Sequence, residues 1–180
     1  PMSRGLGDVY KRQFSGSAYN TSAQFRVQSS NIVIDGSTPQ FITNTGCEGR
    51  CFELKDGNVN LATGSDLTIE AGKGSSGTIV VAIEGSIVGP SSGTPVDISI
   101  TNETTSSGSS SSISLNSDSN KTTGTGINDV TLSANTVNLY GNITTVANGG
   151  SDSGVVSITG ATSLEDNVAI DTSCLLYTSP

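Results

Sequence analysis

Short stretches of alternating apolar and polar residues recur along most of the chain. Each places two or three aliphatic residues at every second position, with mostly small polar residues between them. Because side chains of a β-strand point alternately to its two faces, this period predicts short strands with one buried face and one wetted face. The stretches are Ile32–Ile34, Val59–Leu61, Leu67–Ile69, Ile79–Ile83, Ile98–Ile100, Ile113–Leu115, Val130–Leu132, Val137–Leu139, Val156–Ile158 and Val168–Ile170.

Helical patterning is missing, and Gly, Ser, Thr and Asn, which disfavour helix interiors, make up nearly half of the 180 residues. The strand starts instead repeat: Val130, Val137 and Ile143 are followed by a second set at about 25 residues' distance. One such coil cannot bury its aliphatic residues alone, so coils must stack. The pattern predicts an all-β parallel β-helix. The alternative is a β-sandwich, which antiparallel pairing of these strands would indicate.

A serine-rich segment near residues 104–112 interrupts the pattern, with Ser106–Ser112 of low complexity. We interpret it as a loop that protrudes from one coil, and the alternative is a flexible linker between two domains.

The two ends differ in composition from the rest. Residues 1–13 and 174–180 resemble peptides translated from sequencing-adaptor DNA, which would be excluded from fold reasoning. On this interpretation residues 14–173 are an internal fragment of a longer β-helical protein. That part holds five basic and fifteen acidic residues, a net charge of −10.

Composition argues against several functions. So acidic a chain is unsuited to binding the nucleic-acid backbone, and its longest apolar run, Ile79–Ile83, is too short to insert into a membrane. The sequence has no histidine, which excludes a Ser-His-Asp triad and imidazole metal ligands. Aromatic and basic residues are scarce after Phe52, which argues against a polysaccharide-cleaving site. We expect no catalytic residue, cofactor or metal.

Cys47 and Cys51 form the most distinctive local motif. Glycines at 46 and 49 would let the loop bend and bring the sulfurs together, so the pair is a disulfide candidate in an oxidising compartment. Free thiols are the alternative, and a metal site lacks further soft ligands.

Acidic residues recur at the expected turns. Calcium ligation would require a stricter repeat, so solvated carboxylates are the preferred interpretation. These residues are Asp56, Asp66, Asp97, Asp118, Asp129, Asp152 and Asp166.

The segments 128–145 and 156–173 resemble filamentous-haemagglutinin-like adhesins and related autotransporter passengers of environmental bacteria. The resemblance implies a right-handed parallel β-helix, export to the cell surface and a role in adhesion, with glycans or other cell surfaces as partners. We therefore expect a non-catalytic, rigid spacer and display scaffold. The alternative is part of a polysaccharide-active enzyme whose catalytic coils lie outside this chain.

Overall fold

The protein is all-β in a computed structural model that describes residues 11–16, 18–21, 24–36, 39–43, 47–72, 77–103, 109–118, 121–147 and 154–172. No helix occurs within these ranges. The strands are β1 (Lys11–Phe14), β2 (Ala18–Thr21), β3 (Phe25–Gln28), β4 (Asn31–Ile34), β5 (Gln40–Thr43), β6 (Gly49–Lys55), β7 (Asn58–Leu61), β8 (Leu67–Ala71), β9 (Thr78–Ile83), β10 (Ile87–Val88), β11 (Val96–Asn102), β12 (Ser110–Leu115), β13 (Thr122–Gly124), β14 (Ile127–Leu139), β15 (Asn142–Thr145), β16 (Val156–Leu164) and β17 (Ile170–Thr172).

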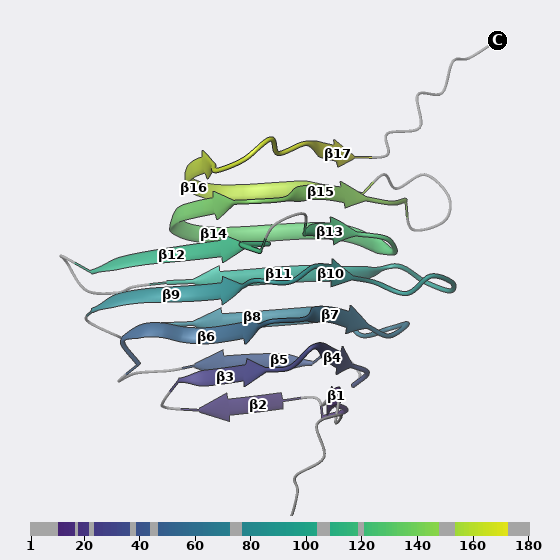
Figure 1. The fold of residues 1–180 in the computed structure, drawn as a ribbon, viewed down its shortest axis with the longest axis horizontal. Coiled ribbons are helices and arrows are strands. Elements are labelled where there is room, and N and C mark those ends of the chain that lie inside the picture. The colour runs from purple at the N-terminus through teal and green to yellow at the C-terminus, as the bar shows by residue number, and fades with distance from the viewer. Residues whose placement is uncertain are drawn as a thin grey trace, which may run out of the picture.

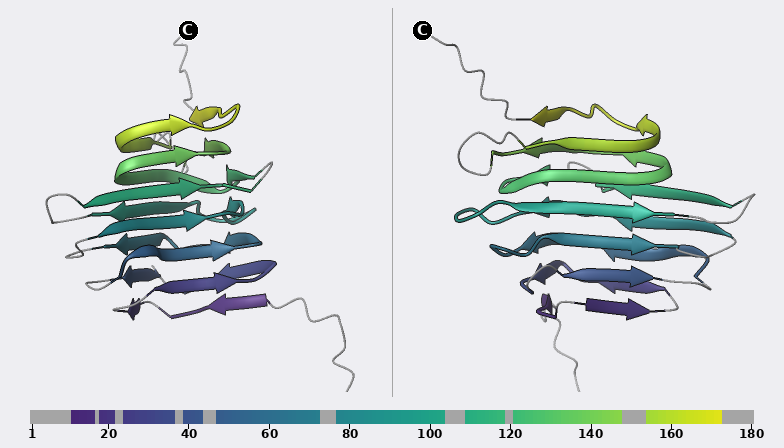
Figure 2. Two further views of the ribbon diagram at one scale, coloured as in Figure 1. Left: turned by 60° about the vertical axis from the view of Figure 1, so that its left-hand side comes forward. Right: turned by 180° about the vertical axis from the view of Figure 1, so that it is seen from behind.

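The strands form two sheets, and each strand pairs mainly with strands of the preceding and following layers (Figure 1). Sheet A has the order β1-β4-β7-β10-β13-β15-β17. Sheet B has two limbs: limb 1 contains β2, β5, β8 and β11, and limb 2 contains β3, β6, β9 and β12. β14 joins the limbs because its first half pairs with β11 and its second half with β12. The chain thus passes from sheet A to limb 1 to limb 2 and back, forming the layers seen in Figures 1 and 2.

All strand pairings among the described residues are parallel. The described residues form strands and no helix, so the all-β class is confirmed. The antiparallel pairing that would indicate a sandwich is not observed among them. Because the pairing is in register, apolar side chains of successive layers lie above one another. One such column continues from limb 1 into β14 and β16, and consists of Phe41, Ile69, Ile100, Leu132 and Ile158.

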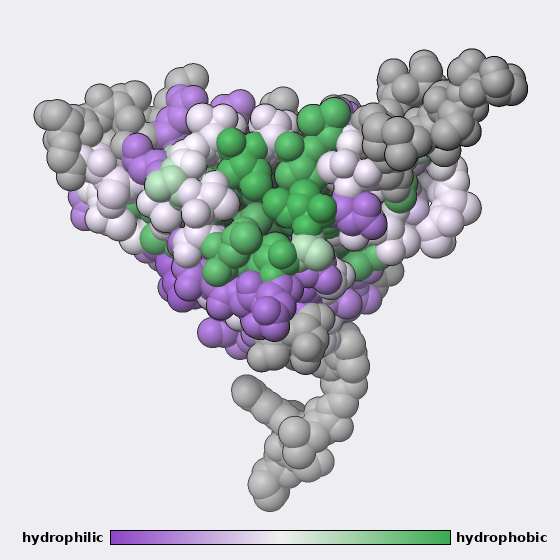
Figure 3. Space-filling model, turned by 90° about the horizontal axis from the view of Figure 1, so that it is seen from above, coloured by the Kyte–Doolittle hydropathy of each residue, from purple (hydrophilic) through white to green (hydrophobic). Residues whose placement is uncertain are grey.

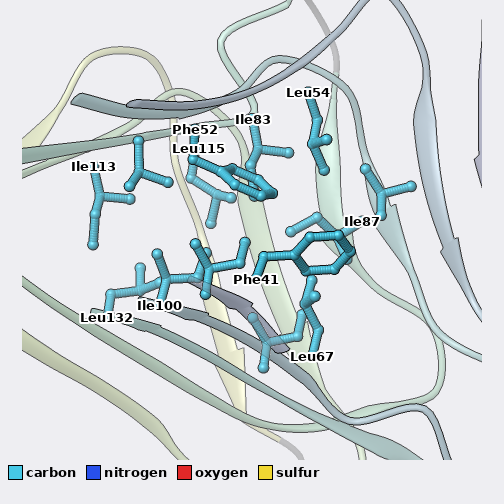
Figure 4. Close-up of a cluster of buried hydrophobic side chains, with 14 of the residues drawn as sticks. Phe41, Phe52, Leu54, Leu67, Ile83, Ile87, Ile100, Ile113, Leu115 and Leu132 are labelled. Atoms are coloured by element: carbon cyan, nitrogen blue, oxygen red, sulfur yellow. The ribbon is translucent and has the colours of Figure 1, made fainter. Parts of the chain in front are cut away.

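These columns form one core between the sheets. The alternating burial of β8 and β11 matches the predicted period of two, with the aliphatic residues inside. Figure 4 shows side chains from both limbs and sheet A meeting in this interior. Among the described residues, sheet A contributes two fully buried polar side chains, Thr123 and Thr145, and the Thr123 hydroxyl donates to Asn116 Oδ1 at 3.0 Å. The interior between the sheets is thus mainly apolar, with a few buried polar side chains.

Aromatic rings fill the core of the first layers. Tyr19 stacks on Phe41 with ring centroids 4.8 Å apart, and Phe25 stacks on Phe52 at 5.2 Å. Phe14 contacts Phe41 edge-on at 5.6 Å. Stacked and edge-to-face arrangements are those that aromatic side chains prefer. The later layers are packed with aliphatic residues instead.

The structure corrects the expected strand divisions near residue 130. Val130–Leu132 and Val137–Leu139 were expected as separate strands, but both belong to β14. Val130 pairs with Val156 and Val137 with Thr162, which are offsets of 26 and 25 residues. Other layers differ in length: Lys11 pairs with Asn31, an offset of 20 residues, and Ile98 pairs with Val130, an offset of 32. The offset varies mainly because the corners between strands differ in length, and it changes by one residue at the register shifts within three of the pairings.

Part of the expected serine-rich loop is a strand. Ser110–Ser112 form the start of β12, and Ser111 is buried. The Ser111 hydroxyl donates to Asn135 Oδ1 at 2.9 Å and accepts from the Asn135 N–H at 2.9 Å. A serine can enter the core side of this strand because its hydroxyl is satisfied there. Residues 104–108 lie outside the described residues.

Two further expectations concern the chain ends. Residues 11–13, assigned above to a terminal tail, form part of β1, which pairs with β4. Residues 1–10 and 173–180 lie outside the described residues. Val168 and Ala169 precede β17 rather than forming part of it.

Candidate functional site

The cysteine motif lies where the chain enters limb 2. Cys47 and Cys51 are joined by a disulfide, with their Cα atoms 5.6 Å apart, and both side chains are buried. Cys51 belongs to β6 and Cys47 precedes it, so the bond fixes the corner against the strand. A buried disulfide at a corner has a structural role and offers no exposed thiol for chemistry.

A cluster of charged residues next to this corner was not anticipated from the sequence. Glu53 on β6 is buried, and its carboxylate accepts a hydrogen bond from Arg26 Nε on β3 at 2.6 Å and a second from Arg50. Arg50 also reaches Glu84 beyond β9 at 3.3 Å, and Lys55 lies 4.0 Å from Glu84. The cluster therefore links three consecutive layers of limb 2. The sequence contains no signal for this cluster, because its partners meet only through the register between the strands. The alternation of apolar and polar residues does not reveal that register.

The electrostatics of this cluster centre on Glu53. Burial alone would raise the pKa of its carboxyl, but hydrogen bonds from Arg50 and Arg26 and their positive charges outweigh burial and lower the pKa below 4.5. A hydrogen bond to Glu53 likewise raises the pKa of Arg50. Glu53 is held ionised by two guanidinium groups, which suits an ion-pair anchor and not a proton donor.

Three of the predicted turn carboxylates form a ladder between layers. Asp66 Oδ1 accepts the Asp97 N–H at 3.0 Å, and Asp97 Oδ1 accepts the Asp129 N–H at 3.1 Å. Asp129 Oδ1 in turn accepts the Val155 N–H at 2.8 Å. We call Asp66, Asp97 and Asp129 the aspartate ladder. Each carboxylate satisfies a backbone donor that begins limb 1 in the next layer.

Other acidic turn residues are spread along the stack. Asp56 accepts from Gln28 Nε2, and Asp166 Oδ1 accepts the N–H of Asn167 at 2.8 Å. Asp118 donates its backbone N–H to the Glu84 carbonyl, and Asp152 lies outside the described residues. Within the described part of the chain, no group of three or more acidic or cysteine side chains is placed to hold a metal ion.

Polar side chains form a second ladder at the corner between limb 2 and sheet A. Asn58 Oδ1 accepts the Ser86 N–H at 3.3 Å, and Ser86 Oγ accepts the Thr122 N–H at 3.1 Å. Further along, Asn142 Oδ1 accepts the Ala169 N–H at 2.8 Å. The donor again belongs to the following layer. Small polar residues recur here because short side chains reach the neighbouring backbone from a turn.

The backbone itself is stacked tightly at this second corner. A Cβ atom on Gly57 would lie 2.1 Å from the Ser29 carbonyl oxygen, and one on Gly85 would lie 1.9 Å from the Gly57 carbonyl oxygen. A Cβ atom on Gly141 would lie 1.9 Å from the Lys121 carbonyl oxygen. Glycine is needed at these positions because no side-chain carbon fits between the layers.

A surface hollow of about 390 Å³ lies at the same corner near the last layers. Its lining is polar apart from one aromatic ring, and consists of Lys121, Thr122, Tyr140, Gly141, Asn142, Asp166 and Asn167. The lining offers an ammonium group, amides, two hydroxyls and one carboxylate for hydrogen bonding. It lacks the pair of carboxylates that glycoside hydrolysis uses. The hollow has room for a small polar molecule.

None of the described residues belongs to a helix long and apolar enough to span a bilayer. Comparison with models of protein families, with curated proteins and with solved structures finds no match to this chain.

Proposed function

We propose that the chain is a right-handed parallel β-helix that acts as a rigid, non-catalytic scaffold in an exported bacterial surface adhesin or filament. The observation that carries this proposal is the continuity of the apolar columns from one layer to the next. The limb 2 column beginning at Phe52 continues through Val81 and Ile113 to Val137, all of them buried. A core continuous over successive layers resists bending, because neighbouring layers are paired along every strand.

Two further features support an extracellular location. Disulfides persist in oxidising compartments, and the Cys47–Cys51 bond fits such an environment. The outward faces carry mainly Ser, Thr and Asn, which suit a hydrated surface presented to other cells. Glycans and other cell surfaces are the proposed partners. The hollow beside Tyr140 matches the first of these, because sugar hydroxyls pair with amides and an aromatic ring can cover a sugar face.

A display scaffold must accept changes at its corners without losing its core. A ten-residue epitope inserted between Ser91 and Ser92, in an exposed corner before β11, tests this property. We expect antibody binding with a thermal unfolding midpoint close to that of the unmodified chain, since the corner carries none of the core. Loss of folding would contradict the scaffold proposal.

The matched control inserts the same epitope between Gly57 and Asn58. The close approach of the Gly57 backbone to the Ser29 carbonyl leaves no room there, so this variant is expected to unfold. Equal stability of the two variants would show that the layers do not stack as proposed. Release of reducing ends from polysaccharides by the unmodified chain would instead favour the enzymatic alternative.

A further inference from the structure

The outer face of limb 1, and of the strand halves that continue it in β14 and β16, carries hydroxyl groups in a regular array. On β11, β14 and β16, two neighbouring outward positions hold serine or threonine, and the strand pairing stacks them into two columns. The first column continues to β8, where Glu70 interrupts the second. We call the array the hydroxyl lattice; its first column is Thr68, Ser99, Thr131 and Ser157, and its second is Thr101, Ser133 and Thr159.

The strands set the spacing of this lattice in both directions. Paired strands of a sheet lie about 4.8 Å apart, and alternate residues of one parallel strand lie about 6.6 Å apart. Ile100 and Leu132, which lie between the two columns in sequence, are fully buried and fix the strands to the core. Figure 3, seen from above, shows apolar residues in the middle and polar residues around them, and the right-hand view of Figure 2 shows the strands of limb 1 one above another. The lattice is therefore rigid and preorganised for a partner with matching repeats.

The hydroxyl groups of the lattice are free to bond to an external partner. Within the described part of the chain they make no hydrogen bond, whereas the hydroxyls of Ser86, Ser111 and Thr123 are bonded inside the protein. The lattice side chains are exposed or half-buried. Each hydroxyl can thus donate one hydrogen bond and accept two from outside.

The surroundings of the lattice restrict the chemistry of that partner. Glu70 lies in line with the second column, and the aspartate ladder lies beside the first, so an anionic polymer is disfavoured. The lattice contains no aromatic, Met or Arg side chain, the types in which protein interfaces are enriched, and no ring to cover a sugar face. The partner that fits is neutral, made of hydrogen-bonding groups and periodic in two directions. Ice has this chemistry, and its oxygen atoms repeat at distances comparable to the two spacings of the lattice.

We propose that the hydroxyl lattice is an ice-binding surface. Each hydroxyl bonds to liquid water as well as to ice, so a single side chain supplies no preference. The preference arises because the rigid array holds several water molecules at once in the positions of an ice plane. This function goes beyond a scaffold and does not depend on the adhesin proposal, because it uses an outer face that the scaffold role leaves free.

Growth of single ice crystals in solutions of the full 180-residue chain tests the proposal. We expect the chain to keep the freezing temperature below the melting temperature, by an interval that widens with protein concentration, and to be enriched in slowly grown ice. Thr131→Tyr places a ring in the middle of the lattice and holds ice away from the neighbouring hydroxyls, so the interval should shrink at least about tenfold. Thr131 is exposed, so this variant is expected to fold.

The matched control is Asn138→Tyr. It adds the same ring to the same strand, but in the second half of β14, on the outward face that continues limb 2. We expect it to give the freezing interval of the unmodified chain. The thermal unfolding midpoints of both variants show whether each is folded.

Three results would overturn the proposal. One is the absence of both a freezing interval and enrichment in ice at about 100 µM, a concentration at which even weak contacts are populated. Another is an interval that Thr131→Tyr leaves unchanged, because ice would then bind elsewhere on the chain. The third is the absence of ice binding together with adsorption to crystalline cellulose or chitin, or a dimer in sedimentation velocity, that Thr131→Tyr abolishes. That result would assign the lattice to a polysaccharide or to a second copy of the chain.

Discussion

The first and last layers of this stack share one strand order but are held together differently. The layers from β1 to β6 contain five packed aromatic rings, the Cys47–Cys51 disulfide and the ion pairs of Glu53. The layers from β14 to β17 rely on aliphatic residues, on strand pairing and on hydrogen bonds such as that from the Val155 N–H to Asp129. The difference shows that parallel strand pairing determines the course of the backbone. Side chains of quite different chemistry can then pack the core and stabilise it.

The largest expected effect tests the aromatic end. Phe52→Ala removes a fully buried ring that stacks on Phe25 and contacts Phe41 edge-on at 5.5 Å. We expect a loss of about 3–5 kcal/mol in the free energy of unfolding, measured in urea. Val137→Ala, in the same column near the other end, is expected to cost about 2 kcal/mol. Equal losses would show that the two ends are packed equivalently.

Reduction of the disulfide tests the corner of the aromatic end. The bond closes a loop of only five residues, so its removal is expected to cost about 2 kcal/mol or less. Unfolding in urea with and without dithiothreitol measures the loss, and Cys47→Ser/Cys51→Ser serves as the control that reductant leaves unchanged. A loss as large as that for Phe52→Ala would mean that the disulfide, rather than the rings, holds this end.

The aspartate ladder gives the corresponding test for the later layers. Asp97→Ala removes the acceptor of the Asp129 N–H and of Asn128 Nδ2, and we expect a loss of about 1–1.5 kcal/mol because the first contact is exposed whereas Asn128 is buried. Asp97→Asn retains an acceptor oxygen and should lose less. Hydrogen exchange at the Asp129 amide reports the same contact directly. If the Asp129 amide is equally protected from exchange in Asp97→Ala, the aspartate ladder does not stabilise these layers.

The smallest expected effect is a loss of folding stability at acid pH. The pKa of Glu53 is lowered in the folded protein, so its ion pairs stabilise the fold fully above pH 4.5, and this contribution is lost as the pH falls through the folded-state pKa. Glu53→Gln should therefore lose less stability between pH 6 and pH 3 than the unmodified chain, as measured by unfolding in urea. Identical slopes in the two proteins would contradict the role given to Glu53.

The strand positions could be predicted from the sequence because alternation records which residues face inward. Ile32–Ile34 and Leu67–Ile69 needed only this local period. The fusion of the strands at Val130 and Val137 could not be predicted, because residues 133–136, three of them polar, suggest a turn when considered alone. Strand pairing carries the backbone through them with a register shift.

The side-chain contacts divide in the same way. Cys47 and Cys51 are close in sequence, so their bond could be anticipated. Glu53 gave no signal, because its partner Arg26 lies 27 residues away and depends on the register between β3 and β6. The aspartate ladder was visible only as a recurrence of turn carboxylates, without the donors that give it its role.

Both ladders have a direction along the chain. In the contacts of Asp66, Asp97 and Asp129, the oxygen belongs to the earlier layer and the N–H to the later one, and the same holds for Asn58 and Asn142. Each completed layer therefore displays acceptors already positioned for amides that have yet to arrive. If the layers fold from the N-terminus onward, each new layer finds the acceptors for its backbone N–H groups already in position. If they fold from the C-terminus, the N–H donors must be ordered before their acceptors are in place.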